Sequence, residues 1–477
     1  MKWSELALLA LGPGETLGQV LQWQISKRPE LPRLRRRDGS SFVSSITNNV
    51  NEGGYFATVK VGSPGQELSL QLDTGSSDVW VPWSGAKLCK DQADGGCPLG
   101  SFKPQQSNTF DDVGENLFNI QYQDKDFAKG DYFTDRFQIG SANLSNLTMG
   151  LGTSTSIPYG LIGIGYINNE ASLQTTNETY PNLPVALQQA GLIKTVAYSL
   201  WLNDLSSSSG SILFGGIDTE KYVGDLTTLP VLRNERADNY TEFAVSLYSV
   251  EASSNSGSDT LTSPQLPVKV VLDSGTSLTY LPQDLATQVW DEVGAVWDSS
   301  VNAAVLPCSF ANHGGHFSFV FAGPKGPRVN VTMDELVLPI STGQAPQFAS
   351  GPYRGQPVCE FGILNQTQAP YLLGDTFLRS AYVVYDLKNN QVAIAATDFN
   401  STKTNVVAFA SDGASIPSAT AVSNDGSGTP PPQATQSGLA ASKGFQAGSG
   451  ATASDPMSRV GFIVLGLTLA HILVLSC

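Results

Sequence analysis

The chain has few basic residues and few histidines and cysteines. Its 477 residues include 27 Lys and Arg against 42 Asp and Glu, which gives a formal net charge of -15 at pH 7. Nucleic-acid binding needs a basic face for the phosphates, so we expect no nucleic acid partner. Two of the three histidines, His313 and His316 in NHGGHF, are expected to be loop residues rather than ligands. We therefore expect neither a metal nor another cofactor.

Helical patterns are also scarce. The clearest are LPVALQQAGLI at 183–193 and LPQDLATQVWDEVGAVW at 281–297. From 53 to 397 the chain instead carries short β-branched and aromatic runs, such as YFATVKVG and LSLQLD, separated by Gly, Asn, Asp and Ser. This pattern predicts a mainly β protein, and the length and the 41% of apolar residues suffice for two core-bearing units.

Cysteine is rare, with five in the whole chain. Cys477 ends an apolar C-terminal run, and the other four permit three different pairings. Economy of loop length favours the pairs Cys89 with Cys97 and Cys308 with Cys359.

The N-terminal region is typical of a secreted precursor. Residues 1–20, beginning MKWSELALLALGPGETLG, predict a signal peptide. The segment 21–37 ends in Arg35, Arg36 and Arg37, which predicts a short propeptide removed at a basic processing site. Seven N-x-[ST] sequons favour N-glycosylation in the secretory route. They are Asn143, Asn146, Asn177, Asn239, Asn330, Asn365 and Asn400.

The C-terminal region predicts attachment to a cell surface. Residues 400–459 are rich in Ser, Thr, Gly and Pro and predict a stalk with too little apolar content for a core. The apolar run 460–477 is long enough to span a bilayer, and a retained span is one interpretation. The small residues Gly448, Ser449 and Gly450, followed by a polar spacer, favour a glycosylphosphatidylinositol (GPI) signal whose tail is removed. We expect the protein to be located on the outer face of the cell membrane, with transfer to the cell wall or shedding as alternatives.

One phrase occurs twice. LQLDTGSSDVW spans 70–80 and VVLDSGTSLTY spans 270–280. The first copy is followed by YGLIGIGY at 159–166 and the second by YLLGDTFL at 371–378. This repeat predicts two homologous lobes, at about 53–220 and about 221–397. If a pseudo-twofold axis relates the lobes, Asp73 and Asp273 meet across it.

Two adjacent carboxyl groups would have a defined chemistry. The first negative charge disfavours the second, so one group stays protonated at mildly acid pH. The charged group can then deprotonate a water while the neutral one serves a carbonyl oxygen as an acid. Gly75 and Gly275 let the backbone approach the carboxylates. Four hydroxyl residues are expected to hold the two groups coplanar, namely Thr74, Ser76, Ser274 and Thr276.

These paired phrases resemble those of the pepsin-like aspartic endopeptidases, and the chain is similar to their fungal GPI-anchored, yapsin-like branch over roughly 55–397. The resemblance implies a bilobal, mainly β fold with a central cleft. It also implies a zymogen that becomes a monomeric enzyme, acting on protein or peptide substrates through an activated water at acidic pH. The catalytic pair would be Asp73 and Asp273, and the disulfides would be the two favoured above.

The resemblance also implies a flap over the cleft. Tyr122 would be the flap tyrosine, with Trp80 packed beneath it, although a strand aromatic in the core is the alternative for Tyr122. The chain departs from the family's glycine-containing flap turns, since Gln123 is followed by Asp124, Lys125 and Asp126. Yapsin-like enzymes typically select basic residues. Together with the flap carboxylates, this resemblance predicts a preference for Lys or Arg beside the scissile bond.

Two other functions remain open from the sequence. A cell-wall glycosidase or transglycosidase also uses paired carboxylates, but it does not need twin D-[ST]-G-[ST]-S phrases. A catalytically silent binding module could use the same scaffold. The presence of both aspartates and their hydroxyl neighbours argues against a catalytically silent module.

Overall fold

The computed structural model describes residues 20–27, 54–91, 95–207, 209–340, 345–422 and 439–446. Strands dominate this part of the chain, so the predicted mainly β class is confirmed. The largest sheet runs in the order β28-β12-β26-β25-β9-β10-β1-β2-β3-β8-β4-β7-β6-β5. Its fourteen strands are β1 (Leu21–Lys27), β2 (Tyr55–Val61), β3 (Gln66–Asp73), β4 (Val79–Pro82), β5 (Asp111–Gln121), β6 (Phe127–Ile139), β7 (Ala142–Thr155), β8 (Leu161–Gly163), β9 (Ala197–Trp201), β10 (Ser209–Phe214), β12 (Tyr222–Pro230), β25 (Ala381–Asp386), β26 (Gln391–Thr397) and β28 (Ala419–Ala421).

Three smaller sheets complete the described strands. The eight-stranded sheet contains β13 (Ala244–Ser254), β14 (Gly257–Leu261), β15 (Val268–Leu272), β16 (Thr279–Pro282), β19 (His316–Phe321), β20 (Arg328–Thr332), β23 (Ile363–Gln366) and β24 (Tyr371–Leu373). The four-stranded sheet contains β17 (Val296–Asp298), β18 (Ala303–Pro307), β21 (Val337–Pro339) and β22 (Val358–Phe361). The last sheet pairs β11 (Gly216–Asp218) with β27 (Val406–Ala408).

Helices are short in the described part of the chain. The α-helices are α1 (Lys87–Lys90), α2 (Ser172–Thr175), α3 (Leu183–Gln189), α4 (Gln283–Val293), α5 (Met333–Leu336), α6 (Asp375–Leu378) and α7 (Ser442–Phe445), and the 3-10 helices are η2 (Pro104–Gln106), η3 (Ile167–Asn169) and η4 (Cys308–Asn312). The two predicted helices are present as α3 and α4. Helix α4 buries Leu285, Val289 and Val293, which lie four residues apart on one face. It ends at Gly294, whose φ of 72° suits glycine.

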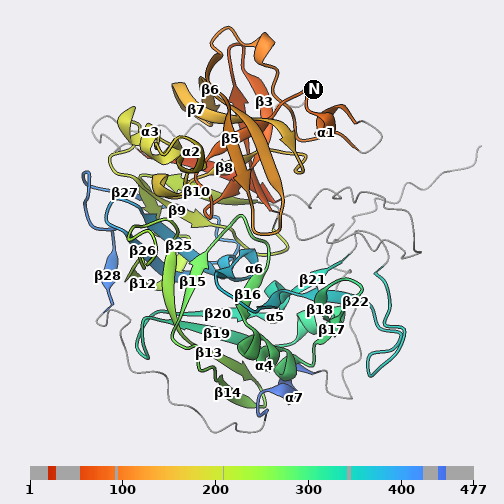
Figure 1. Cartoon of the computed structure of the whole chain (residues 1–477). Coiled ribbons are helices and arrows are strands. Elements are labelled where there is room, and N and C mark those ends of the chain that lie inside the picture. The colour runs from red at the N-terminus through yellow and green to blue at the C-terminus, as the bar shows by residue number, and fades with distance from the viewer. Residues whose placement is uncertain are drawn as a thin grey trace, which may run out of the picture.

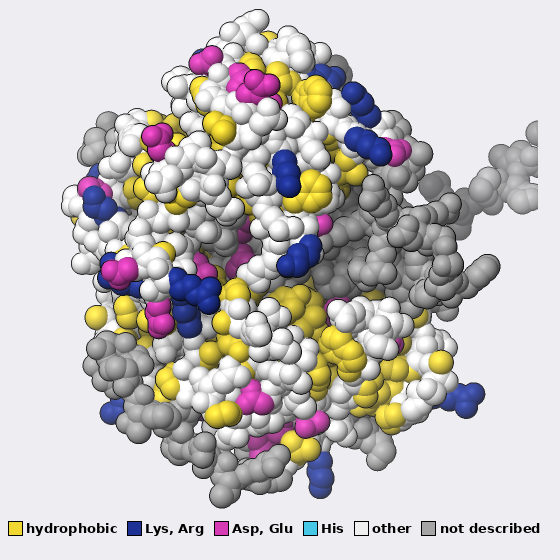
Figure 2. All heavy atoms as spheres, in the orientation of Figure 1, with side chains coloured by type: hydrophobic (Ala, Val, Ile, Leu, Met, Phe, Trp, Pro, Cys, Tyr) yellow, Lys and Arg dark blue, Asp and Glu magenta, His cyan; other side chains and the backbone are white. Residues whose placement is uncertain are grey.

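The molecule has two lobes, which Figure 1 shows one above the other. Strands β2 to β8 build the upper lobe, and the eight-stranded and four-stranded sheets build the lower one. The fourteen-stranded sheet crosses the predicted lobe boundary near residue 220, because β12, β25 and β26 continue it. Figure 2 shows a hollow between the lobes with acidic side chains inside it.

The segment predicted as a propeptide takes part in the large sheet. Strand β1 pairs with β10 from Leu21 to Ser26 and also with β2. Trp23 and Ile25 are buried in the core. Residues 1–19 of the predicted signal peptide and the basic processing site at 35–37 lie outside the described residues.

The predicted stalk at 400–459 needs a correction in the parts that the structure describes. Residues beyond 400 pack on the body, since β27 pairs with β11 and β28 pairs with β12. Phe409 and Ile416 are buried, and so is Phe445 in α7. Apolar residues are few in this region, but several of those described pack against the rest of the fold. The described part of the chain has no helix long and apolar enough to span a membrane, and residues 460–477 lie outside it.

Candidate active site

In each repeated phrase the aspartate lies at the end of an interior strand or directly after it. Strand β3 is buried from Leu68 to Asp73 and pairs in parallel with β8, so both of its faces are covered. Strand β15 pairs in parallel with β24 in the same way and leads into Asp273. Asp73 is 4% exposed and Asp273 is 9% exposed. The buried strands therefore carry both carboxyl groups to the junction of the lobes.

The two carboxyl groups have equivalent local partners. The Gly75 amide donates to Asp73 Oδ1 at 2.8 Å, and the Gly275 amide donates to Asp273 Oδ1 at 2.9 Å. The Ser76 hydroxyl donates to Asp73 Oδ2. In the other lobe, the Thr276 hydroxyl donates to Asp273 Oδ2 at 2.6 Å. Each aspartate is thus fixed by one amide and one hydroxyl, so two of the four predicted hydroxyl residues, Ser76 and Thr276, bond the carboxyl groups.

Thr74 and Ser274 have a different role from the one predicted. Their hydroxyls do not bond the carboxylates but cross between the lobes. Thr74 Oγ1 donates to the Leu272 carbonyl at 3.0 Å and accepts from the Ser274 amide at 2.9 Å. Ser274 Oγ donates to the Leu72 carbonyl and accepts from the Thr74 amide, both at 3.2 Å. This reciprocal network ties the two aspartate loops together.

The two carboxyl groups lie against each other. A methyl group at Gly75 would lie 2.5 Å from Asp273 Oδ1, and one at Gly275 would similarly overlap Asp73 Oδ1. Burial, the neighbouring charge of Asp273 and a hydrogen bond between the carboxyl groups raise the pKa of Asp73 to about 7. Ser76 and Gly75 oppose this shift by donating to the charged form. The pair therefore holds a proton through the mildly acid range.

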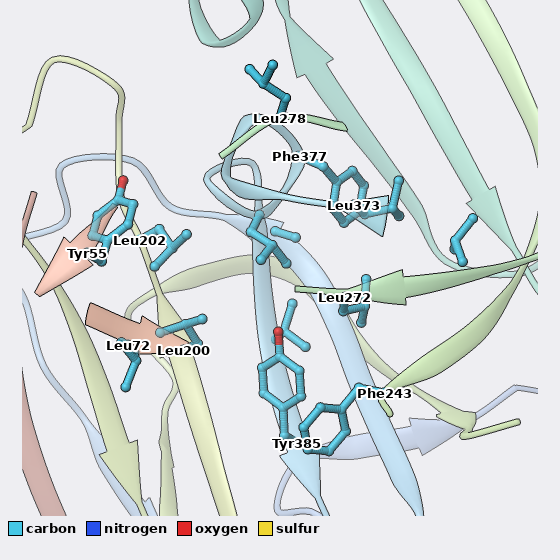
Figure 3. Close-up of a cluster of buried hydrophobic side chains, with 14 of the residues drawn as sticks. Tyr55, Leu72, Leu200, Leu202, Phe243, Leu272, Leu278, Leu373, Phe377 and Tyr385 are labelled. Carbon is cyan, nitrogen blue, oxygen red and sulfur yellow. The ribbon is translucent and has the colours of Figure 1, made fainter. Parts of the chain in front are cut away.

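Apolar side chains support the pair from below. Leu72 and Leu272, which precede the aspartates, are fully buried. Figure 3 shows them in one cluster with Phe243 and Tyr385. The rings of Phe243 and Tyr385 meet edge to face with centroids 4.6 Å apart. The close packing restricts movement of the strand ends that carry the carboxyl groups.

A hairpin from the upper lobe carries the predicted flap residues. Tyr122 directly follows β5, and β6 begins at Phe127, so residues 122–126 form the hairpin tip. The buried Trp80 indole donates to the Tyr122 hydroxyl at 2.8 Å. Tyr122 is half-buried against the cluster that contains Trp80, and the structure brings these two predicted residues together.

The acidic residues of the tip are held by local bonds. Asp124 is exposed, and its Oδ1 accepts the Asp126 amide at 2.9 Å. Asp126 Oδ1 accepts the Ser156 hydroxyl at 3.1 Å. Lys125 lies between them with a φ of 76°. The carboxylates thus shape the turn that replaces the usual glycines.

Comparisons with known proteins agree with this arrangement. Residues 54–397 match the family model described as eukaryotic aspartyl protease. The chain belongs to the eukaryotic aspartyl protease family. It is 40% identical to "Probable aspartic-type endopeptidase opsB" of Aspergillus fumigatus over 92% of this chain and 86% of the relative. It is 36% identical to "Secreted aspartic protease 8" of Candida albicans over 74% of this chain and 78% of the relative.

A solved structure supports the fold of this aspartyl protease. The aspartic proteinase from Irpex lacteus aligns with a TM-score of 0.58, covering 81% of this chain and 100% of that one at 20% identity. The predicted pepsin-like, bilobal fold is confirmed. The family also decides between the functions left open by the sequence, because its fungal relatives are named as endopeptidases. The protein is an aspartic endopeptidase, and the glycosidase alternative has no support.

Both predicted disulfides are present in the protease. Cys89 and Cys97 are joined with their Cα atoms 4.6 Å apart, and Cys308 and Cys359 with theirs 4.9 Å apart. The first closes the α1 loop beside the upper lobe, and the second links η4 to β22.

Asp78 is a buried group of the site that the sequence did not single out. It lies two residues before Trp80 and is fully buried. The hydroxyls of Tyr132 and Tyr180 donate to its Oδ1 at 2.9 and 2.7 Å, and the Ala171 amide donates to its Oδ2 at 2.8 Å. Burial nevertheless raises its pKa. Asp78 thereby connects the flap strand β6 to the loop that follows η3.

A buried ion pair was also missed. Arg379 and Glu335 are each 2% exposed, and their side chains are in direct contact. Arg379 follows α6 and Glu335 lies in α5. Glu335 also accepts the Leu205 amide at 2.8 Å, so the pair joins three distant parts of the chain.

The remaining predicted sites are placed as follows. His313 follows η4, whereas His316 is the first residue of β19 rather than a loop residue. Five sequon asparagines are exposed and two are half-buried. The exposed ones are Asn143, Asn146, Asn177, Asn330 and Asn400, and the half-buried ones are Asn239 and Asn365. The GPI attachment candidates at 448–450 lie outside the described residues.

Proposed function

We propose that this endopeptidase cleaves peptide bonds with Asp73 and Asp273 as its catalytic pair and works at acid pH from the outer face of the cell membrane. The observation that carries the catalytic part is the contact between the two carboxyl groups, with the pKa of Asp73 raised to about 7. At acid pH the pair then holds one proton and one negative charge, which is the state that can supply both a base and an acid.

The proposed reaction uses water as the nucleophile. The charged carboxylate takes a proton from the water as its oxygen attacks the peptide carbonyl carbon, and the neutral carboxyl gives its proton to the carbonyl oxygen. The tetrahedral gem-diol then breaks its C–N bond. The carboxyl group that took the water proton gives it to the leaving nitrogen, and the other, now charged, carboxylate takes a proton from one of the two hydroxyls, whose oxygen becomes the new carbonyl oxygen. The pair is then singly protonated again. No covalent bond to the enzyme forms.

The test is digestion of a peptide library from acid to mildly alkaline pH, with products identified by mass spectrometry. Internal cleavage that declines as pH rises through about 7 is expected, because the pair then loses its proton. An alkaline optimum would contradict the shared proton.

Attachment through a GPI anchor is the second part of the proposal. It is supported by the small residues at 448–450, the apolar run at 460–477 and the sequons, five of which have exposed asparagines. Deletion from Val460 onward should release the protease into the medium, as should phosphatidylinositol-specific phospholipase where the lipid is sensitive. Detection of Cys477 in the mature protein would refute anchor attachment.

A preference for basic residues is the third part. Exposed Asp124 and half-buried Asp126 place carboxylates at the flap tip. Attraction between these carboxylates and a substrate cation would favour a basic peptide over a neutral one by roughly tenfold to hundredfold in kcat/KM. We would compare kcat/KM for matched Lys and Leu peptides in the parent and in an Asp124→Asn, Asp126→Asn double variant. Asparagine keeps the oxygens that accept the Asp126 amide and the Ser156 hydroxyl, so these two bonds can survive the loss of charge. Equal rates on both peptides in the parent would dismiss the preference.

A further inference from the structure

The end of the described chain is bound to the lower lobe far from the active site. Helix α7 packs against α4 and β13. Figure 1 shows it at the end of that lobe farthest from the upper lobe and its flap hairpin. The preceding residues predict an unstructured stalk, so this contact is unexpected from composition.

An aromatic side chain anchors the contact. Phe445 is fully buried and stacks on Phe317 of β19, with centroids 5.2 Å apart and an interplanar angle of 10°. The Phe445 ring occupies the space where a side chain at Gly315 would lie. The His313 ring nitrogen Nδ1 contacts the Phe445 carbonyl oxygen. The lobe thus encloses the Phe445 side chain completely.

Backbone hydrogen bonds fix the segment along its length. The Ala441 amide donates to Asp259 Oδ2 at 2.7 Å, and the Ser254 hydroxyl donates to the Ala441 carbonyl at 2.6 Å. Ser256 Oγ donates to the Ala440 carbonyl at 2.7 Å and accepts the Gly444 amide at 3.0 Å. Residues of the β13–β14 hairpin therefore bond both N–H and C=O groups of the segment's backbone. This pattern resembles a peptide-binding site more than an incidental contact.

The segment lies immediately before the candidate attachment residues. Gly448 lies three positions after Phe445, a distance of roughly 10 Å at most when the chain is extended. A free stalk from Val422 to Gly448 would instead have a root-mean-square length of roughly 30 Å. Docking of α7 removes most of that reach.

We propose that the α7 end of the lower lobe is the surface of the protease that faces the lipid bilayer. This inference rests on the GPI anchor of the proposed function. An anchor attached at 448–450 would hold that end next to the lipid, with the upper lobe and flap pointing away. The cleft would then be separated from the lipid by the thickness of the lower lobe. The substrates would therefore be extracellular chains that extend that far from the membrane, rather than segments at the membrane surface.

The test measures energy transfer from the mature anchored protease to headgroup-labelled phosphatidylcholine vesicles. A donor is placed either on Val296→Cys in the lower lobe or on Val113→Cys in the upper lobe, at exposed positions 40% and 51% accessible. We expect strong transfer from the lower label and weak transfer from the upper one. Equal transfer from both labels would overturn the proposal.

Matched variants test whether the docked segment sets the orientation. Phe445→Ala should reduce the difference in energy transfer between the lower and the upper label. Leu439→Ala, at a position 49% exposed in the same segment, should preserve that difference. Ala441→Pro removes the amide that bonds Asp259 and provides a second disrupting variant. Peptidase activity of each variant reports folding. A contrast unchanged in both disrupting variants would overturn the proposal.

Failure of the anchor is distinguishable from failure of the orientation. Flotation with vesicles, lost after phospholipase treatment, establishes the anchor before any transfer is measured. A protein that does not float would refute the anchor and the orientation with it. A protein that floats but gives equal transfer from both labels would refute the orientation alone.

Discussion

Replacing Asp73 by Asn should change how the stability of the protease depends on pH. Asparagine retains the oxygen that accepts the Gly75 amide but binds no proton. In the parent, burial and Asp273 raise the pKa of Asp73 from 3.8 to about 7, so the native state keeps a proton that the unfolded chain has lost. Its stabilising contribution is therefore complete below about pH 4 and is lost as pH rises through about 7. A shift of about 3 pH units corresponds to a loss on the order of 4 kcal/mol.

The assay is differential scanning calorimetry of the parent and Asp73→Asn at about pH 4 and about pH 7. The parent should lose more stability between these pH values than the variant does, by up to about 4 kcal/mol. Asp412→Asn, at a half-exposed ion pair, controls for removal of one charge. Equal losses in the parent and Asp73→Asn would refute the shared proton, since other buried acids contribute to both proteins alike.

Two further predictions use matched substitutions. Gly75→Ala should abolish peptidase activity, because its methyl group would displace the opposite carboxyl group, whereas Gly314→Ala meets no atom within 4 Å and should remain active. Activity retained in Gly75→Ala would contradict the close contact of the pair. Glu335→Gln should destabilise the fold by about 3–5 kcal/mol because it leaves Arg379 buried without its partner charge. Glu251→Gln breaks a more exposed ion pair and should cost at most about 1 kcal/mol, and equal costs on denaturant unfolding would contradict the reasoning.

The chemistry of the pair was predictable because the sequence states it twice. Each aspartate follows an interior strand and precedes glycine and hydroxyl residues, so local sequence determines its partners. Thr74 and Ser274 were misjudged because their partners belong to the other lobe, some 200 positions away. The acceptors that they reach depend on how the lobes meet, which no local pattern encodes.

The network around Asp78 was hidden for the same reason. Its donors come from Tyr132, Ala171 and Tyr180, which are far from it in sequence. Composition also misled at the C-terminal side of residue 400, where a low apolar content predicts a stalk. Phe409 and Phe445 are nevertheless buried, because a preformed body supplies the rest of each apolar contact. A short segment need not form its own core to be bound.

The most direct test of the account is the peptidase activity of Asp273→Asn, purified and shown by calorimetry to be folded. Asparagine keeps the oxygen that accepts the Gly275 amide, while the oxygen that accepts the Thr276 hydroxyl becomes an NH2 group and one carboxyl group is lost. The account predicts a fall in kcat/KM of about 10²- to 10⁴-fold on a peptide that the parent cleaves at acid pH. A folded variant that retains activity within about tenfold of the parent would contradict catalysis by the aspartate pair.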